Sequence, residues 1–403
     1  MASATPLLKD DKAQPGCILG VLSEGFSPDA KLSKGDQRVS MVPEVAAQLM
    51  KDGYAVHVEK GAGLYAGFSD KAYADKGCVV ASRGDVIDKS QVLFALDAPV
   101  QDFSTMNCKV LVSWVGRLQD KGKEIISKAN QYRITIVDVT AVPRITIAQK
   151  LDVLSSQAKV AGHRAVLEAA HSYQRFHTAE MTAAGKYPPA QTFVLGCGVA
   201  GLAAIGTSKA LGSVVRAWDV RDVSDQVHSM GAKWVKVDFK ESGEGQGGYA
   251  KESSDAFKKV QQETFKQVLK ECDIAISTAA IPGRPSPLLI TKDAVAVMKP
   301  GSVIVDLAAV GGGNCELTKL NETIITPNGV TIIGYANLPA RMPEQASAMY
   351  AQNMANLLKH IHDKGKAAAL LDNLYGALDK GEAGLGKSLV GVRDYRVLGF
   401  TGL

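Results

Sequence analysis

The sequence has few of the features that mark disulfide-bonded, metal-binding or membrane-spanning proteins. Its 403 residues include six cysteines, spaced too widely for a CxxC or Cys/His ligand pattern, so a reducing compartment and no structural metal are expected. No apolar run approaches the roughly eighteen residues that cross a bilayer. The stretch from Met1 to Gly16 lacks the apolar core of a signal peptide and the arginines of a mitochondrial presequence. Direct membrane insertion is therefore not expected.

A one-sided charge is also missing. The net charge of +5 is the difference between 46 basic and 41 acidic side chains, and no dense basic run occurs, so nucleic acid is not an expected partner. The chain instead has 46% hydrophobic and 22% charged residues, the balance of a globular protein whose length suits two domains.

The most informative stretch runs from Thr192 to Gly212. An apolar strand pattern leads into Gly196-x-Gly198-x-x-Gly201, and an Ala-rich helix pattern follows. Gly196 permits a tight turn, Gly198 lets backbone approach a pyrophosphate, and Gly201 lets helix pack close to strand. The N-terminus of the helix would offer N–H groups to the phosphates. The order predicts a dinucleotide-binding turn; the alternative is an ordinary glycine-rich turn.

The next strand pattern, from Ser213 to Asp219, ends in an acid eighteen residues past Gly201. A carboxylate there can accept both hydroxyls of an adenosine ribose and repels a 2′-phosphate, so the pattern favours NAD(H) over NADP(H). Arg216 and Arg221 lie close in sequence and leave room for the opposite preference.

Strand and helix patterns alternate in both halves of the chain. They run from Cys17 to Val139 and again over residues 190–339, where further strands are expected at 233–238, 273–278, 302–307 and 330–334. Such alternation predicts βαβ units and mostly parallel sheets. Gly61-Ala-Gly63 also follows a strand pattern, but it lacks a third glycine and a later acid-ended strand, so it is interpreted as a turn.

Two segments admit a functional and a plain interpretation. Gln149, Asp152 and Ser155 or Ser156 share one face near the start of a helical pattern that continues to about Phe176; this face is either a cleft wall or a solvated surface. The polar, glycine-rich stretch 241–254, with Tyr249 in its middle, is either a lid or loose connecting chain, and the aromatic side chain favours a lid.

Five separated motifs carry a family resemblance. They are RITIAQKLDVLSSQAKVAG at 144–162, GCGVAG at 196–201, GGYAKE at 247–252, IPGRP at 281–285, and KPGSVIVDLA at 299–308 with GGNC at 312–315. In order and spacing they resemble the NAD(H)-binding component, a separate alpha subunit, of proton-translocating NAD(P) transhydrogenase, in the alanine dehydrogenase/transhydrogenase superfamily. The resemblance implies an α/β fold of two Rossmann-like doubly wound domains joined by long helices, with NAD in the interdomain cleft. The first domain would comprise residues 1–160 and 340–403, and the NAD(H)-binding domain residues 161–339.

The resemblance also implies site residues. The catalytic group around the nicotinamide and its ribose would be Arg144, Gln149, Asp152 and Ser155. The cofactor would be bound by Arg144, Ile145, Thr146, Gln149, Asp152, Gly196, Cys197, Gly198, Val199, Gly201, Asp219, Val220, Arg221, Gly248, Tyr249, Gln261 and Ala280. No metal is expected. The chain departs from the family pattern at Ala280, where a larger apolar residue is usual, at Val310, where an acid is usual, and at Leu22-Ser-Glu24, where the family has Lys-Glu.

The implied activity is hydride transfer from NADH on this chain to NADP+ on a partner subunit, coupled to proton movement through membrane-spanning subunits. The chain would be a homodimer, cytoplasmic and attached peripherally to the inner membrane, or in the mitochondrial matrix if eukaryotic. Alanine dehydrogenase is the rival enzyme, but that chemistry needs a general acid/base. The family's His, expected after the strand Leu111–Trp114, and its Asp, expected in the segment Ala308–Gly311, are both missing, although Arg38 remains, as a substrate-carboxylate Arg would. A non-enzymatic NADH sensor is the other alternative.

Overall fold

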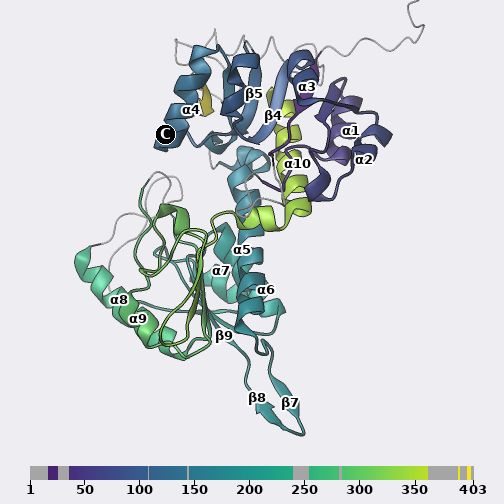
Figure 1. Cartoon of the computed structure of the whole chain (residues 1–403). Helices are drawn as coiled ribbons and strands as arrows, with labels where there is room; N and C mark the ends of the chain where they lie inside the picture. The colour runs from purple at the N-terminus through teal and green to yellow at the C-terminus, as the bar shows by residue number, and fades with distance from the viewer. Residues whose placement is uncertain are drawn as a thin grey trace, which may run out of the picture.

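The protein folds into two lobes, each built around a mostly parallel β-sheet (Figure 1). The computed structural model describes residues 17–25, 36–107, 109–142, 145–238, 254–280, 284–361, 389–390 and 397–400. The two sheets and the alternation of strands with helices confirm the predicted α/β, Rossmann-like fold class.

The first sheet has the order β16-β17-β6-β5-β4-β1-β2-β3 among the described residues. Its strands pair in parallel except for β16, which runs antiparallel to β17. Most of β4 is buried along a continuous apolar run, which is typical of a parallel strand covered on both faces. The strands are β1 (Ile18–Val21), β2 (Ala55–Glu59), β3 (Val79–Ala81), β4 (Val92–Asp97), β5 (Val110–Trp114), β6 (Thr135–Asp138), β16 (Leu389–Val390) and β17 (Val397–Phe400).

Helices cover this sheet and begin with ordinary start signals. Pro43 opens α1, and the hydroxyls of Ser69 and Ser82 accept the N-terminal N–H groups of α2 and α3, which satisfies donors that a helix start leaves unpaired. The helices are α1 (Pro43–Lys51), α2 (Asp70–Asp75), α3 (Arg83–Lys89) and α4 (Asp120–Gln131), with short 3₁₀ helices η1 (Leu64–Ala66), η2 (Val100–Thr105), η3 (Val139–Ala141) and η4 (Thr146–Leu151).

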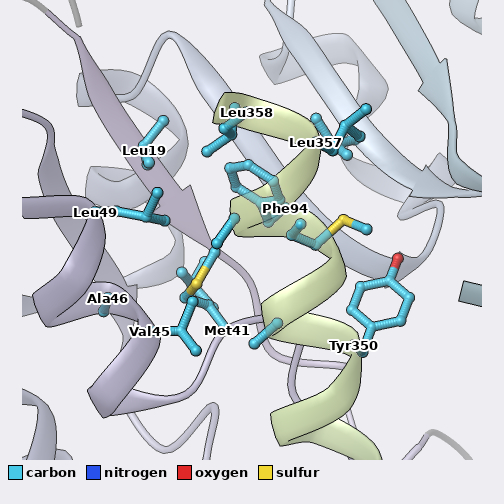
Figure 2. Close-up of a cluster of buried hydrophobic side chains, with 14 of the residues drawn as sticks. Leu19, Met41, Val45, Ala46, Leu49, Phe94, Tyr350, Leu357 and Leu358 are labelled. Carbon is cyan, nitrogen blue, oxygen red and sulfur yellow. The ribbon is translucent and has the colours of Figure 1, made fainter. Parts of the chain in front are cut away.

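The core of the first lobe is completed by α10 (Pro343–Ile361), which lies far away in the sequence. Figure 2 shows Tyr350, Leu357 and Leu358 of this helix directed into the same cluster as Leu19 of β1 and Phe94 of β4. All five side chains are buried. The first core is therefore built from segments that precede the second lobe in the sequence and from a helix that follows it.

The second sheet has the order β11-β10-β9-β12-β13-β15-β14, with β14 antiparallel. Its strands are β9 (Gln191–Leu195), β10 (Val214–Trp218), β11 (Lys233–Trp234), β12 (Ile274–Ser277), β13 (Val303–Asp306), β14 (Thr323–Ile325) and β15 (Thr331–Ile333). The helical segments are α6 (Val199–Ala210), α7 (Ser224–Ser229), α8 (Asp255–Glu271), α9 (Lys292–Ala296), η6 (Ala309–Gly311) and η7 (Leu338–Arg341). The strands expected at 233–238, 273–278, 302–307 and 330–334 are all present, and each is shorter than its apolar pattern.

In both sheets the strand order reverses at one point. The first strand, β1 or β9, lies between the second strand, β2 or β10, and the fourth, β4 or β12. Ligands of open α/β sheets bind at the carboxyl ends of the strands on either side of such a reversal. The fold thus offers two positions to inspect, one in each lobe.

The lobes are joined by α5 (Val153–Tyr173), which begins beside the first lobe and runs along the second (Figure 1). A β-carbon on Gly162 would overlap the carbonyl oxygen of Ala200, so glycine lets α5 and α6 touch backbone to backbone. The hairpin of β7 (Glu180–Thr182) and β8 (Gly185–Tyr187) projects from the end of the second lobe opposite the first. Because β9 starts just after this hairpin, its carboxyl end points towards the first lobe.

The five cysteines in the described ranges are free and buried. Among the helices that the structure describes, none has the length and apolar character needed to cross a membrane. In the same residues, His, Cys, Asp and Glu side chains form no group of three or more that could hold a metal ion.

Candidate functional site

The glycine-rich turn after β9 has the predicted conformation. Gly196 has φ +95°, and a β-carbon there would lie 2.6 Å from Oγ1 of Thr278, so this position requires glycine. A β-carbon on Gly201 would overlap the carbonyl oxygen of Gly196, which explains the third glycine. Gly198, by contrast, is exposed and has nothing within 4 Å of its β-carbon position. The backbone at Gly198 is therefore accessible to a ligand, whereas Gly196 and Gly201 are packed closely against other parts of the protein.

The helix α6 starts at this turn. Its first residue is Val199, and its N-cap is Gly198, which supplies no side-chain cap. The first N–H groups of a helix have no partner within the helix and carry its positive dipole end. The N-terminus of this twelve-residue helix therefore lies at the open side of the turn, where its N–H groups suit an anion.

Asp219 follows β10 and is 8% exposed. Its Oδ2 accepts the N–H of Cys197 at 2.8 Å, which joins the acid directly to the glycine-rich turn. Burial, with the nearby charge of Asp219 adding to it, raises the pKa of the Cys197 thiol. Cys197 therefore stays a neutral thiol and contributes its backbone to the site.

A second network, which the sequence analysis did not single out, holds the other side of the turn. The Asp306 side chain accepts from Ser277, Thr318 and the N–H groups of Ala308, Asn314 and Cys315. Asn314 in turn accepts the N–H of Ala279 at 3.1 Å and donates to its carbonyl at 2.8 Å. Next to Ala279, the Thr278 hydroxyl donates to the carbonyl of Gly196 at 3.0 Å. The signal in the sequence that could have pointed to this network is Asp306 itself, an acid at the end of an apolar strand pattern.

The segment before α5 requires a correction. Gln149 was expected near the start of the long helix, but it lies in the 3₁₀ helix η4, and α5 begins only at Val153 and ends at Tyr173. The reason is Asp152, the N-cap, whose carboxylate accepts the Ser155 N–H at 3.0 Å and the Ser155 hydroxyl at 2.5 Å. A side chain that caps a helix fixes its first residue. Asp152 and Ser155 are brought together, and Gln149 is exposed one turn earlier.

The remaining expected residues differ in their exposure. Ile145 and Thr146 are exposed beside η4, and Ala280 is exposed after β12. Val220 is half-buried beside Asp219, and Gln261 is buried on α8. Arg144, Gly248 and Tyr249, and with them the expected lid, lie outside the described residues.

Arg38 does not have the setting of a substrate-binding arginine. Its guanidinium donates to both oxygens of Asp36, at 3.0 and 2.6 Å, and to Oε1 of Gln157 at 2.7 Å. Asn337 completes the cluster by donating to Asp36 at 2.7 Å. Burial works against ionisation, yet the hydrogen bonds and charge of Arg38 hold the pKa of Asp36 below its usual value. The cluster ties the first lobe to α5 and to the segment before α10.

The fold and the turn define a Rossmann-type, dinucleotide-binding α/β protein. Two family models match the chain: Alanine dehydrogenase/PNT, N-terminal domain, over residues 30–161, and Alanine dehydrogenase/PNT, C-terminal domain, over residues 165–379. The chain belongs to the alanine dehydrogenase/PNT family, and the resemblance found in the sequence is confirmed.

Individual relatives narrow the likeness. The chain is 46% identical over 332 residues to NAD(P) transhydrogenase subunit alpha of Haemophilus influenzae, covering 82% of this chain and 64% of that protein. It is 44% identical over 340 residues to NAD(P) transhydrogenase subunit alpha of Cereibacter sphaeroides, covering 83% and 65%. A solved transhydrogenase from Sinorhizobium meliloti is 35% identical with a TM-score of 0.74, covering 85% and 93%. The chain spans just under two thirds of the Haemophilus and Cereibacter subunits.

Proposed function

We propose that this chain is the NAD(H)-binding component of a transhydrogenase, which presents NADH to NADP+ held by a partner subunit. The observation that carries the proposal is the glycine-rich turn, open at Gly198 and joined through Cys197 to the buried Asp219. The transhydrogenase alpha subunits that the chain matches at 44% and 46% identity support the same assignment, as does NAD(H), the cofactor of that family.

The residues around the turn suit a dinucleotide. The N-terminus of α6 and the bare backbone at Gly198 would hold the pyrophosphate, with Val199 beside it. Asp219, with Val220 and Arg221, would hold the adenosine ribose, while Ala280 and Gln261 would border the adenosine. Gly248 and Tyr249 would belong to the lid. These roles rest on the family resemblance and on the geometry of Gly198 and Asp219.

The nicotinamide end would be held by Arg144, Ile145, Thr146, Gln149, Asp152 and Ser155. The Ser155 hydroxyl donates to Asp152, so this pair is preorganised, and the exposed Gln149 is left to contact an incoming molecule. Bound NADH supplies the hydride, and its transfer to a second nicotinamide releases no proton at either carbon. The chain therefore has to orient a ring and needs no acid or base.

Alanine dehydrogenase is the alternative enzyme. Arg38 would be its natural carboxylate ligand, but Arg38 is 8% exposed and is committed to Asp36 and Gln157. The His that this chemistry would place after the strand Leu111–Trp114 is also missing from the sequence. Both observations favour transhydrogenation.

The decisive experiment is reconstitution. The isolated chain should bind NADH without turnover, and adding an NADP(H)-binding subunit should produce hydride transfer, followed by the absorbance of the reduced nucleotides. If the chain binds NADH but no hydride transfer occurs after the partner is added, the NADH-sensor interpretation would be favoured. Turnover of pyruvate and ammonia by the isolated chain would establish the dehydrogenase instead.

The wider assembly belongs to the same proposal. The chain would form a homodimer, attach to the membrane only through membrane-spanning partner subunits, and serve proton translocation there. Its first domain would comprise residues 1–160 and 340–403 and its second residues 161–339, a division supported by α10 in the first core and by the pairing of β17 with β6. Sedimentation showing only monomer at micromolar concentration would remove the homodimer.

A further inference from the structure

Two asparagines of α10 hold the end of η4, the 3₁₀ helix that carries Gln149. Nδ2 of Asn353 and Nδ2 of Asn356 both donate to the carbonyl oxygen of Lys150, at 2.9 and 3.0 Å. A carbonyl oxygen has two lone pairs, so these two amides use its full capacity. The donors lie 203 and 206 positions after the acceptor in the sequence. The residue next to Gln149 is therefore fixed by a helix from the far end of the described chain.

Asn353 also reaches the other side of the helix cap. Its Oδ1 accepts the hydroxyl of Ser156, in the first turn of α5, at 2.7 Å. One side chain thus joins the last turn of η4 to the first turn of α5, with the extended residue Asp152 between them. Asn353 is 8% exposed, and both ends of its amide have a partner. Such hydrogen bonds are directional, so they fix an orientation that an apolar side chain would not.

The joint that Asn353 spans lies where hydride transfer is proposed to occur. Two nicotinamide rings react only when the reacting atoms are about 3–3.5 Å apart, and an error of about 1 Å can slow a reaction about a hundredfold. The exposed Gln149 lies on the η4 side of the joint, and Asp152 and Ser155 lie at the start of α5. Their relative placement therefore depends on how η4 meets α5.

We infer that Asn353 is a positioning residue for hydride transfer, which holds Gln149 in a fixed place relative to Asp152 and Ser155. The inference rests on the proposed function and deepens it. Asn353 acts from behind the site, through the carbonyl of Lys150 and the hydroxyl of Ser156, and contacts neither nucleotide.

The same helix offers a matched control. Ser347 of α10 is fully buried, and its hydroxyl accepts the N–H of Val39 at 2.9 Å. Ser347→Ala removes a buried hydrogen bond of α10 without touching Lys150 or Ser156. A loss of stability that is general to the first core should therefore follow from this variant as well as from Asn353→Ala.

The first test needs no nucleotide. Hydrogen–deuterium exchange of the full chain is followed by mass spectrometry in peptides that cover residues 148–156 and in peptides that cover β4, in the same core. In Asn353→Ala, exchange in residues 148–156 should become about tenfold faster relative to β4, as for local loss of buried hydrogen bonds. Asn356→Ala, which leaves the Ser156 contact in place, should have a smaller effect, and Ser347→Ala should leave the ratio within about twofold. An equal change in β4, or an equal ratio in Ser347→Ala, would overturn the inference.

The second test measures the reaction with the NADP(H)-binding subunit present. In Asn353→Ala, single-turnover hydride transfer should slow by about tenfold or more, while the NADH dissociation constant, from fluorescence titration, stays within about threefold, because the proposed adenosine and pyrophosphate contacts lie in the second lobe. In a Gln149→Asn background, Asn353→Ala should slow transfer by less than about twofold further, since the group that it positions is already lost. Fully additive effects of the two substitutions would overturn the inference.

The outcomes separate this inference from the proposed function. A wild-type chain that binds no NADH, or transfers no hydride with its partner, overturns the proposed function and this inference with it. Transfer by the wild type, with an equal rate in Asn353→Ala, overturns the inference alone. Weaker NADH binding in Asn353→Ala that accounts for the whole loss of activity would likewise overturn it, because the residue would then serve binding and not the placement of the rings.

Discussion

At the carboxyl edge of each sheet, an acid at or just past the end of the second strand accepts a backbone N–H from the turn after the first strand. In the second lobe Asp219 accepts from Cys197 at 2.8 Å, and in the first lobe Glu59 accepts from Ser23 at 2.7 Å. Each acid also pairs with an arginine, Arg221 in one case and Arg83 in the other. The two reversal points of strand order therefore share an acid, an arginine and a backbone donor.

The surroundings of the two arginines differ. Arg83 is held by Glu59 at 2.7 Å, by Asp102 at 2.7 and 3.1 Å and by the carbonyl of Ser23 at 3.1 Å, all of them remote in the sequence. Arg221 pairs with Asp219, two residues earlier in the chain. In the first lobe, moreover, the carboxylate of Glu24 accepts the N–H groups of Leu96 and Asp97, at 2.6 and 3.1 Å, at the end of β4.

The comparison teaches that strand order alone does not make a nucleotide site. In the first lobe the backbone donors at the reversal point are taken by the carboxyl groups of Glu59 and Glu24. The turn after β1 has Leu22 and Glu24 at the positions where the turn after β9 has Gly196 and Gly198. In the second lobe glycine keeps the backbone accessible. The first reversal point is thus closed by side chains of the protein, whereas Gly198 at the second is exposed, with nothing within 4 Å of its β-carbon position.

The largest expected effect separates the two kinds of glycine in the second turn. Gly201→Ala places a methyl group against the Gly196 carbonyl, so we expect a loss of about 3 kcal/mol of unfolding free energy and no NADH binding. Gly198→Ala meets nothing within 4 Å; it should fold normally and lose at least about tenfold in NADH affinity, because its methyl group stands where the pyrophosphate approaches. Thermal melts and NADH titrations of both variants test this. Unchanged affinity in Gly198→Ala would contradict the ligand role.

Gln149 tests the contact between the two nucleotides. In Gln149→Asn, NADH affinity should stay nearly unchanged, because Asp152 and Ser155 keep their own hydrogen bond. Single-turnover hydride transfer, with the partner subunit present, should slow by about two orders of magnitude, or about 2.7 kcal/mol of barrier. A glutamine that only faces solvent would show neither effect. An ordinary cofactor ligand would lose binding and rate together.

The two acids should respond differently to removal. Asp219→Ala should weaken NADH binding by about 1.5–3 kcal/mol, since a charge-assisted contact to the ribose is lost, and the wild type should bind NADH at least about tenfold more tightly than NADPH. Glu59→Ala should leave both affinities unchanged and lower thermal stability instead, because Arg83 loses a partner. If Glu59→Ala changed the NADH dissociation constant, the acid at the first reversal point would also take part in NADH binding, and the distinction between the two lobes would be wrong.

The last prediction concerns Glu24 and the pH dependence of stability. Burial, the dominant cause, raises the pKa of this carboxyl to about 8, so the folded chain binds its proton more tightly than the unfolded chain does. Stability from this group is fully present below the unfolded value of 4.5 and is lost as the pH rises through about 8. When the pH is raised from about 5 to about 9, the melting temperature of the wild type should fall further than that of Glu24→Gln. The difference should be roughly 2–4 °C for each kcal/mol of stability that the protonated Glu24 contributes. If the melting temperatures of the two proteins changed equally with pH, the prediction would be wrong.

The sequence was sufficient for features that depend on local order. The turn at Gly196–Gly201, the acid at Asp219 and the alternation of strands and helices are all encoded within short windows, and the family resemblance rests on such windows. The start of α5 was misjudged because Asp152 has the spacing of a helical residue but serves as a cap. The remote partners of the Asp36–Arg38 pair, Gln157 and Asn337, were not predictable, because hydrogen bonds across 119 and 299 positions leave no trace in spacing.

The placement of α10 bears on how the chain is made. Its apolar side chains complete the first core, yet they leave the ribosome about 220 residues after β6. At roughly 5–20 residues per second, the nascent first sheet waits on the order of 10–45 seconds with the core between it and α1 still incomplete. The second lobe, whose sheet comes from one continuous stretch, is completed during that interval. Biosynthesis thus reverses the order of the sequence: the nucleotide-binding half matures first, and the half that begins the chain is closed last.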